Sequence, residues 1–221
     1  DIMSLPFNSS TTVMYYNKDA FKKAGLDPEQ PPKTWDEVRA ATESLKASGS
    51  SCPMTISWMG WTQLESFSSW HDVPYASQNN GFDGLDAELQ FNSPLHVRHF
   101  ENLQKMSEDK LFVYKGRATD SISSFTNGEC AIIFGSSASY AGFKRDAKFE
   151  FGETTLPYYD DVEAAPKNTM IGGASLWVMA GKPEKHYRGI AGFCNFISQP
   201  EIQAASHQRT GYLPVTVEAY K

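Results

Sequence analysis

The stretch that decides the fold is Cys130-Ala131-Ile132-Ile133-Phe134-Gly135-Ser136-Ser137-Ala138-Ser139. Its first five residues form an uninterrupted apolar run, which is typical of a β-strand covered on both faces. Gly135 and the serines then mark a turn into a helix, which we expect to run to about Arg145. A buried strand that leads directly into a helix is the repeating unit of α/β proteins, whose ligands bind at the carboxyl ends of the strands.

Strands and helices alternate on both sides of this stretch, as apolar periodicity and turn residues indicate. The expected strands are 11–16, 55–57, 149–154 and 171–179. The expected helices include 18–24, 34–48, 62–70, 184–198 and 201–209, the last ending at Gly211. This alternation predicts an α/β fold without internal repeats.

Two helix starts have specific signatures. Thr34-Trp35-Asp36-Glu37 is a capping box, in which the Thr34 and Glu37 side chains bond each other's backbone N–H groups. Ser93-Pro94 places an N-cap serine before a proline at the first helical position. In the helix that follows, we expect the buried stripe to consist of Val97, Phe100, Leu103 and Met106.

Composition excludes several classes of protein. The chain has 221 residues, 40% of them hydrophobic and 21% charged, which is ordinary for a globular fold and allows one domain or two. The net charge is −6 and basic residues are not interleaved with aromatic ones, so nucleic acid is not an expected partner. No apolar run approaches the roughly 18 to 20 residues that a membrane span needs.

Metal and cofactor chemistry have no recognisable motif. Cys52, Cys130 and Cys194 are odd in number and match no zinc spacing, so we interpret them as small buried hydrophobic residues. The five histidines form no HExxH pair, and we predict no metal site. Gly172-Gly173 lacks the third glycine of a dinucleotide fingerprint, and we predict no cofactor.

Enzymatic interpretations are weaker than binding ones. Ser136 lies on a strand-to-helix turn, as the nucleophile of an α/β-hydrolase does, but the Gly-x-Ser-x-Gly motif is absent. A serine at a helix start is more often an N-cap or a ligand donor. Glu65, Asp72 and Glu129 could serve a glycosidase, but nothing in their spacing distinguishes them from surface carboxylates.

Several residues suit the binding of a small anionic or polar solute. Ser136-Ser137 precede a helix whose N–H groups could hold a phosphate, and Asn8-Ser9-Ser10-Thr11 offers similar donors beside a strand. Trp58 and Trp61 could present flat faces to a sugar, a glycerol backbone or a quaternary ammonium group. Core packing is the alternative role for both tryptophans.

Longer motifs resemble a known family. Tyr16-Asn17-Lys18-Asp19, followed by Pro31-Pro32-Lys33-Thr34-Trp35, resembles the extracellular solute-binding proteins of the maltose-binding type. Three further motifs are similar to those of the members of this family that bind glycerol 3-phosphate for ABC importers. They are Gly60-Trp61-x-Gln63-Leu64-Glu65, Asn79-Asn80-Gly81-Phe82-Asp83-Gly84 and Thr210-Gly211-Tyr212-Leu213-Pro214, and the likeness also includes residues 171–179.

The resemblance implies a function without covalent chemistry. It implies capture of glycerol 3-phosphate and of glycerophosphodiesters such as glycerophosphocholine in the periplasm, with delivery to the permease subunits of an ABC importer. The ligand contacts that it implies are Ser10, Trp58, Trp61, Ser136, Gly173 and Tyr212. A sugar-binding relative and a secreted hydrolase acting through Ser136 remain the alternatives.

The resemblance also implies a fold of two α/β lobes joined by hinge strands, which closes on its ligand. Residues 15–170 would form the carboxy-terminal lobe. Residues 1–14 and 171–221 would be hinge strands and part of the other lobe. Since the family's chains begin earlier and end later, this chain corresponds to one nearly whole lobe and a piece of the other, and alone it is expected to bind weakly or not at all.

Overall fold

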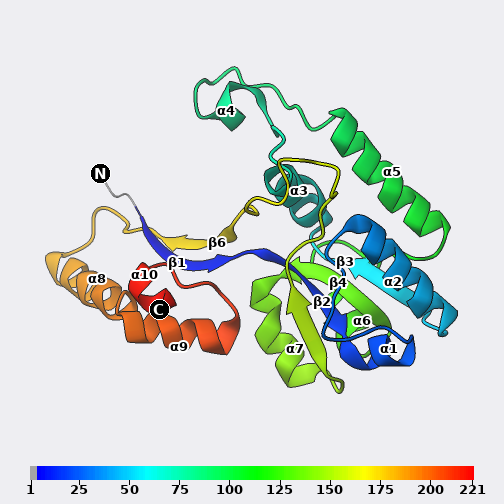
Figure 1. Ribbon diagram of the computed structural model, residues 1–221. Coiled ribbons are helices and arrows are strands. Elements are labelled where there is room, and N and C mark those ends of the chain that lie inside the picture. Colours follow the sequence, from blue (N-terminus) through cyan, green and yellow to red (C-terminus); the bar gives the residue numbers. More distant parts are fainter. Residues whose placement is uncertain (1–3) are drawn as a thin grey trace. The chain divides into compact units, whose positions relative to one another are not determined.

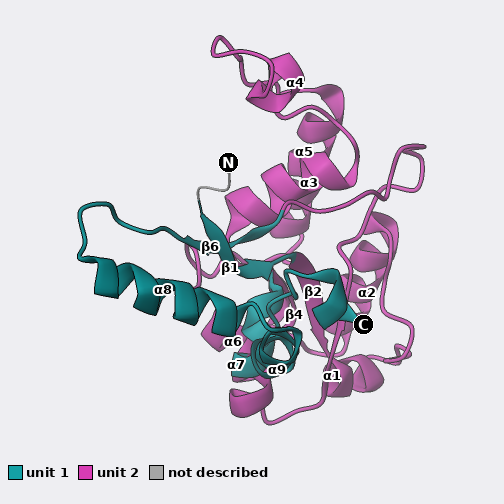
Figure 2. Ribbon diagram, turned by 90° about the vertical axis from the view of Figure 1, so that its left-hand side faces the viewer, with its two compact units in different colours: residues 1–11, 136–142, 171–221 teal, residues 12–135, 143–170 magenta. Residues whose placement is uncertain are grey.

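A computed structural model describes residues 4–221, so the first three residues of the predicted hinge segment 1–14 lie outside the described part. The chain divides into two compact units (Figure 2). Among the described residues, unit 1 comprises 4–11, 136–142 and 171–221, and unit 2 comprises 12–135 and 143–170. The assignment of segments to the lobes of a longer protein stays a prediction.

A four-stranded sheet forms the centre of unit 2, in the order β3-β4-β2-β5 (Figure 1). Its strands are β2 (Thr12–Asn17), β3 (Cys52–Ile56), β4 (Cys130–Ser136) and β5 (Phe151–Thr154). β3 and β4 are parallel, whereas β2 and β5 are antiparallel. All of β3 and the first six residues of β4 are buried, which confirms the prediction from the apolar run.

Local sequence signals explain the first two helices of unit 2. α1 (Lys18–Lys23) begins where Asn17 Oδ1 accepts the N–H of Ala20 at 2.9 Å. α2 (Trp35–Ala47) has the predicted capping box, and the N–H groups of Lys33 and Thr34 that bond Glu37 hold the pKa of its carboxyl below the usual range. The other helices of unit 2 include the π-helix η1 (Trp61–Glu65), α3 (Ser66–Trp70), α4 (Ser77–Gly81), α5 (Pro94–Glu108) and α6 (Ile122–Thr126).

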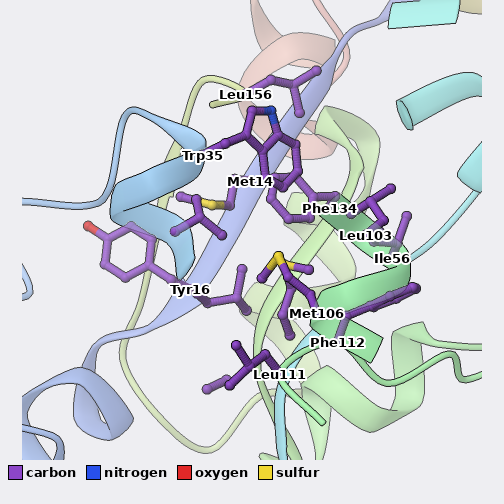
Figure 3. Close-up of a cluster of buried hydrophobic side chains, with 14 of the residues drawn as sticks. Met14, Tyr16, Trp35, Ile56, Leu103, Met106, Leu111, Phe112, Phe134 and Leu156 are labelled. Atoms are coloured by element: carbon purple, nitrogen blue, oxygen red, sulfur yellow. The ribbon is translucent and has the colours of Figure 1, made fainter. Parts of the chain in front are cut away.

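Side chains from strands and helices meet in the core of unit 2 (Figure 3). Trp35 of α2 stacks on Phe134 of β4 at 5.6 Å between ring centroids, and Met14 of β2 is fully buried in the same cluster. Full burial of one such side chain contributes roughly 1.5 to 3 kcal/mol. The core therefore fixes α2 on the sheet whose strand ends carry the candidate site residues.

The buried stripe of α5 differs from the predicted one. Leu103 and Met106 are buried as expected, but the exposed fraction is 47% for Val97 and 36% for Phe100. Their expected places belong to His96 and His99, which have no exposed surface. The pattern misled because a histidine ring can be buried when both of its nitrogens are hydrogen-bonded, as these are.

The interpretation of the cysteines was wrong for two of them. Cys52 and Cys130, which are partners in the register of β3 and β4, form a disulfide across 78 residues of sequence. Cys194 is free and half-buried. The sequence could not show the pairing, because it depends on which two strands are neighbours.

Unit 1 is built on an antiparallel pair, β1 (Leu5–Ser10) and β6 (Gly172–Leu176). The sequence predicted a longer second strand, and β1 lies within residues 1–14, which the resemblance implied to be a hinge strand. The helices of unit 1 include α8 (Glu184–Ile197), α9 (Pro200–Thr210), α10 (Val217–Tyr220) and the short 3-10 helix η2 (Ser137–Ser139). α7 (Tyr140–Asp146) has its first three residues in unit 1 and the rest in unit 2.

Candidate functional site

The two units hold different parts of the predicted site. Unit 1 contains Ser10, Ser136, Gly173 and Tyr212, and unit 2 contains Trp58 and Trp61. Across residues 4–221, no helix is long and apolar enough to cross a membrane, and no three histidine, cysteine or acidic side chains gather as metal ligands would.

In unit 1, the residues that follow Ser10 and Ser136 bond to each other. The N–H of Ser137 donates to the Thr11 carbonyl at 2.8 Å, and the N–H of Thr11 donates to Ser137 Oγ at 3.2 Å. These bonds join the end of β1 to the start of η2. Ser10 itself is the last residue of β1 and only 5% exposed.

Ser136 is the N-cap of η2, and its Oγ accepts the N–H of Ala138 at 3.2 Å. Because Thr11 already accepts the N–H of Ser137, two N–H groups at this helix start have partners within the chain. A phosphate would therefore meet fewer backbone donors here than the sequence suggested.

Gly173 can only be glycine. Its φ is +132°, and a Cβ at its position would lie 2.2 Å from the Asn8 carbonyl oxygen. Gly173, Ser9 and Pro214 line a hollow of about 600 Å³ in unit 1. Asn8 also lines this hollow, and its buried Oδ1 has no hydrogen-bond partner among residues 4–221.

Tyr212 is fixed by the residues on either side of it. Gly211 has φ +81°, and a Cβ there would lie 2.3 Å from the Ser137 carbonyl oxygen. Leu213 donates its N–H to the Ser9 carbonyl at 2.6 Å. The structure thus gathers the segments of all four candidates of unit 1 around the end of β1.

In unit 2, Trp58 has an unusual backbone conformation. Its φ is +51°, in the left-handed region that bulky residues rarely occupy. Its N–H donates to the Ala118 carbonyl at 3.0 Å, and its carbonyl accepts the N–H of Thr62 at 2.9 Å. The side chain is 47% exposed, so packing does not account for the strain, and such outliers cluster at functional sites.

Trp61 is half-buried and begins the π-helix η1. π-helices are rare and often lie at functional sites. The sequence motif identified Trp61, but the π-helix itself and the buried histidines near it were missed. The one available signal was Gln63 of the same motif, whose Oε1 bonds His99 Nε2 at 3.1 Å.

The three carboxylates considered for catalysis lie in two kinds of surroundings. Glu129 pairs with Lys115, which holds the pKa of its carboxyl below the usual range, so it is poorly suited to act as an acid. Glu65 and Asp72 line a hollow of about 520 Å³ in unit 2 together with apolar and aromatic residues.

The α/β fold has an exposed, strained tryptophan in unit 2, and serine hydroxyls beside close-packed glycines in unit 1, and each of these features suits the binding of a small solute. The chain belongs to the family of bacterial extracellular solute-binding proteins, whose family model matches residues 1–221. Members of this family bind solutes and are not enzymes, which sets aside a hydrolase role for Ser136.

Curated relatives match the whole chain. It is 56% identical over 220 residues to the sn-glycerol-3-phosphate-binding periplasmic protein UgpB of Yersinia pestis bv. Antiqua (strain Antiqua). Identity to the protein of the same name from Salmonella typhimurium (strain LT2) is 53%. Each match covers 100% of this chain and 50% of the relative, so the chain spans about half the length of these proteins.

Solved structures share the fold. UgpB from Mycobacterium tuberculosis, in complex with glycerophosphocholine, superposes with a TM-score of 0.80 at 24% identity, covering 99% of this chain and 55% of that one. Maltose-bound MalE3 from T. maritima gives 0.78 at 20% identity, covering 100% of this chain and 56% of that one. These likenesses confirm the predicted α/β fold of the maltose-binding type.

Proposed function

We propose that this chain is part of a periplasmic protein that captures glycerol 3-phosphate and glycerophosphodiesters such as glycerophosphocholine. The protein delivers them to the permease subunits of an ABC importer and catalyses no covalent step. The relatives' names support the choice of ligand, since identity of 53–56% extends over the whole chain. The relatives are twice as long, so the full binding function belongs to a protein of their length.

The observation on this chain that carries a binding role is the strained, half-exposed Trp58. A backbone cost of about 1 to 3 kcal/mol without compensating burial is expected where the side chain contacts a ligand. We propose Trp58 and Trp61 as the contacts of the ligand's carbon atoms and of the trimethylammonium group of glycerophosphocholine.

We propose four residues of unit 1 as the contacts of the ligand's oxygen atoms. They are Ser10, Ser136, Gly173 and Tyr212. The hydroxyl groups and the Gly173 N–H would bond phosphate or glycerol oxygens, and the chain's net charge of −6 does not prevent this, because local dipoles decide the binding of a buried anion. Their gathering around the end of β1 supports this role.

The Cys52–Cys130 disulfide supports an oxidising compartment. Stable disulfides are rare in the cytosol and common in the bacterial periplasm. Localisation to the periplasm also agrees with the names of the relatives.

Isothermal titration tests the proposal on a full-length protein that contains this chain. Glycerol 3-phosphate, glycerophosphocholine and maltose are titrated separately. Micromolar or tighter binding of the first two without turnover is the expected result. Binding of maltose alone would instead favour a sugar-binding protein, and release of phosphate or choline would contradict a passive binding role.

A further inference from the structure

A buried polar network borders the π-helix that carries Trp61. Gln63, within η1, is 2% exposed and bonds His99 of α5, which has no exposed surface. Because Gln63 Oε1 can only accept, His99 Nε2 carries the hydrogen and its Nδ1 accepts from the Tyr159 hydroxyl at 3.4 Å. The network therefore connects η1 to two other parts of unit 2.

The His99 ring cannot turn away from this geometry. It stacks on Phe67 with ring centroids 4.0 Å apart and an angle of 9° between the planes. The Trp35 ring contacts it from α2, with centroids 4.8 Å apart. With its ring fixed by α2 and α3, His99 sets the position of the Gln63 amide.

A second set of hydrogen bonds, made by Thr62, also holds η1. Thr62 is 1% exposed, and its hydroxyl lies 3.1 Å from the Ser57 carbonyl and 3.3 Å from the Trp58 carbonyl. Two consecutive residues of η1 are thus bonded to different parts of unit 2, Thr62 to the residues that follow β3 and Gln63 to His99 of α5. Because π-helices are rare, we attribute the formation of η1 over these residues to the two anchors.

We infer that Gln63 and His99 are positioning residues, which hold the π-helix and thereby set the direction of Trp61 for ligand binding. This inference rests on the proposed function, because it assigns the network to the ligand site. The side chains of Thr62, Gln63 and His99 are all buried. Because no water replaces a lost partner there, each of their bonds constrains η1 strongly.

The test compares Gln63→Met with Thr42→Val in the full-length protein. Gln63→Met keeps the length of the side chain and removes the bond to His99. Thr42→Val removes an equally buried hydroxyl, which donates to the Arg39 carbonyl and makes no hydrogen bond to η1 within residues 4–221. Glycerophosphocholine is titrated calorimetrically at a temperature where near-ultraviolet circular dichroism shows every variant to be folded.

We expect Gln63→Met to raise Kd about tenfold, and Thr42→Val to lower the melting temperature while leaving Kd unchanged. Thr62→Val, which removes the second anchor at constant shape, provides the same test if Gln63→Met does not fold. Equal Kd values for the wild type and the η1 variants would overturn the inference alone. Absence of binding by the wild-type protein would instead overturn the proposed function.

Discussion

Gly173 lies so close to Asn8 that a Cβ on Gly173 would be 2.2 Å from the Asn8 carbonyl oxygen. Gly173→Ala is therefore expected to push β6 away from β1 and to strain a backbone at φ +132°. Strain of this kind costs about 1 to 3 kcal/mol, and binding of glycerophosphocholine should weaken with it. Urea denaturation and calorimetric titration of the full-length protein measure both effects.

Gly189→Ala is the matched control. Gly189 lies within α8, and a Cβ there has nothing within 4 Å. Alanine is favoured over glycine inside a helix, so stability should rise by roughly 0.5 to 1 kcal/mol without a change in affinity. If Gly173→Ala behaved like this control, the close approach to Asn8 would not matter.

The strain at Trp58 can be isolated with two substitutions. Trp58→Ala and Trp58→Gly both remove the indole, but only glycine relieves the left-handed backbone at φ +51°. The glycine variant should be more stable by about 1 to 2 kcal/mol in urea denaturation. Both should bind glycerophosphocholine more weakly than the wild type. Equal stability of the two variants would mean that the backbone is not strained in solution.

The buried histidines predict a loss of stability in acid. Burial lowers the pKa of His71 from 6.5 to about 4, and it lowers those of His96 and His99 as well. His71 Nε2 accepts the N–H of Tyr159 at 3.1 Å, and protonation would end this bond. The charged neighbours of His71 are Arg98, which lowers its pKa further, and Asp161, which raises it.

The direction of this pH dependence of stability follows from proton uptake on unfolding. A folded pKa below the unfolded one means that the unfolded chain binds more protons, so the contribution to stability is complete above about pH 6.5 and is lost as the pH falls toward 4. From pH 7 to pH 5, His71 alone should lower the free energy of unfolding by about 2 kcal/mol. His71→Gln should reduce this dependence in urea denaturation, and a wild-type free energy that is constant over this range would contradict the argument.

Because of the disulfide between β3 and β4, the stability of the protein should depend strongly on whether these cysteines are oxidised. It closes a segment of 78 residues, and replacing both Cys52 and Cys130 by alanine should cost about 2 to 5 kcal/mol. Cys194→Ala, at a half-buried free cysteine, serves as the control. A double variant with the same urea midpoint as this control would show that the disulfide contributes little.

Sequence patterns were most successful where one local signal decides the structure. The apolar run of β4 predicts a buried strand because no polar side chain interrupts it, and the structure confirms this. Thr34 and Glu37 lie three residues apart, so their reciprocal capping is visible in the sequence alone. The motifs likewise identified the family, which the match over residues 1–221 confirms.

Sequence patterns failed where tertiary contacts determine which residues are buried or bonded. His99 is buried because Phe67, Gln63 and Tyr159 come from distant parts of the chain to stack on it and bond it. The apolar rule chose Phe100 instead, one residue away on the helix. The Cys52–Cys130 pair depends in the same way on strand order. The positive φ of Trp58 has no signature in the sequence, because tryptophan seldom adopts it.

Trp61→Ala most directly tests the proposal that this chain binds a small solute. The measurement is the Kd of glycerophosphocholine, by isothermal titration of the full-length protein. If Trp61 contacts the ligand, Kd should rise about tenfold or more relative to the wild type, while the melting temperature stays nearly unchanged. A large fall in melting temperature at constant Kd would contradict the proposed ligand contact, since Trp61 would then be a core residue.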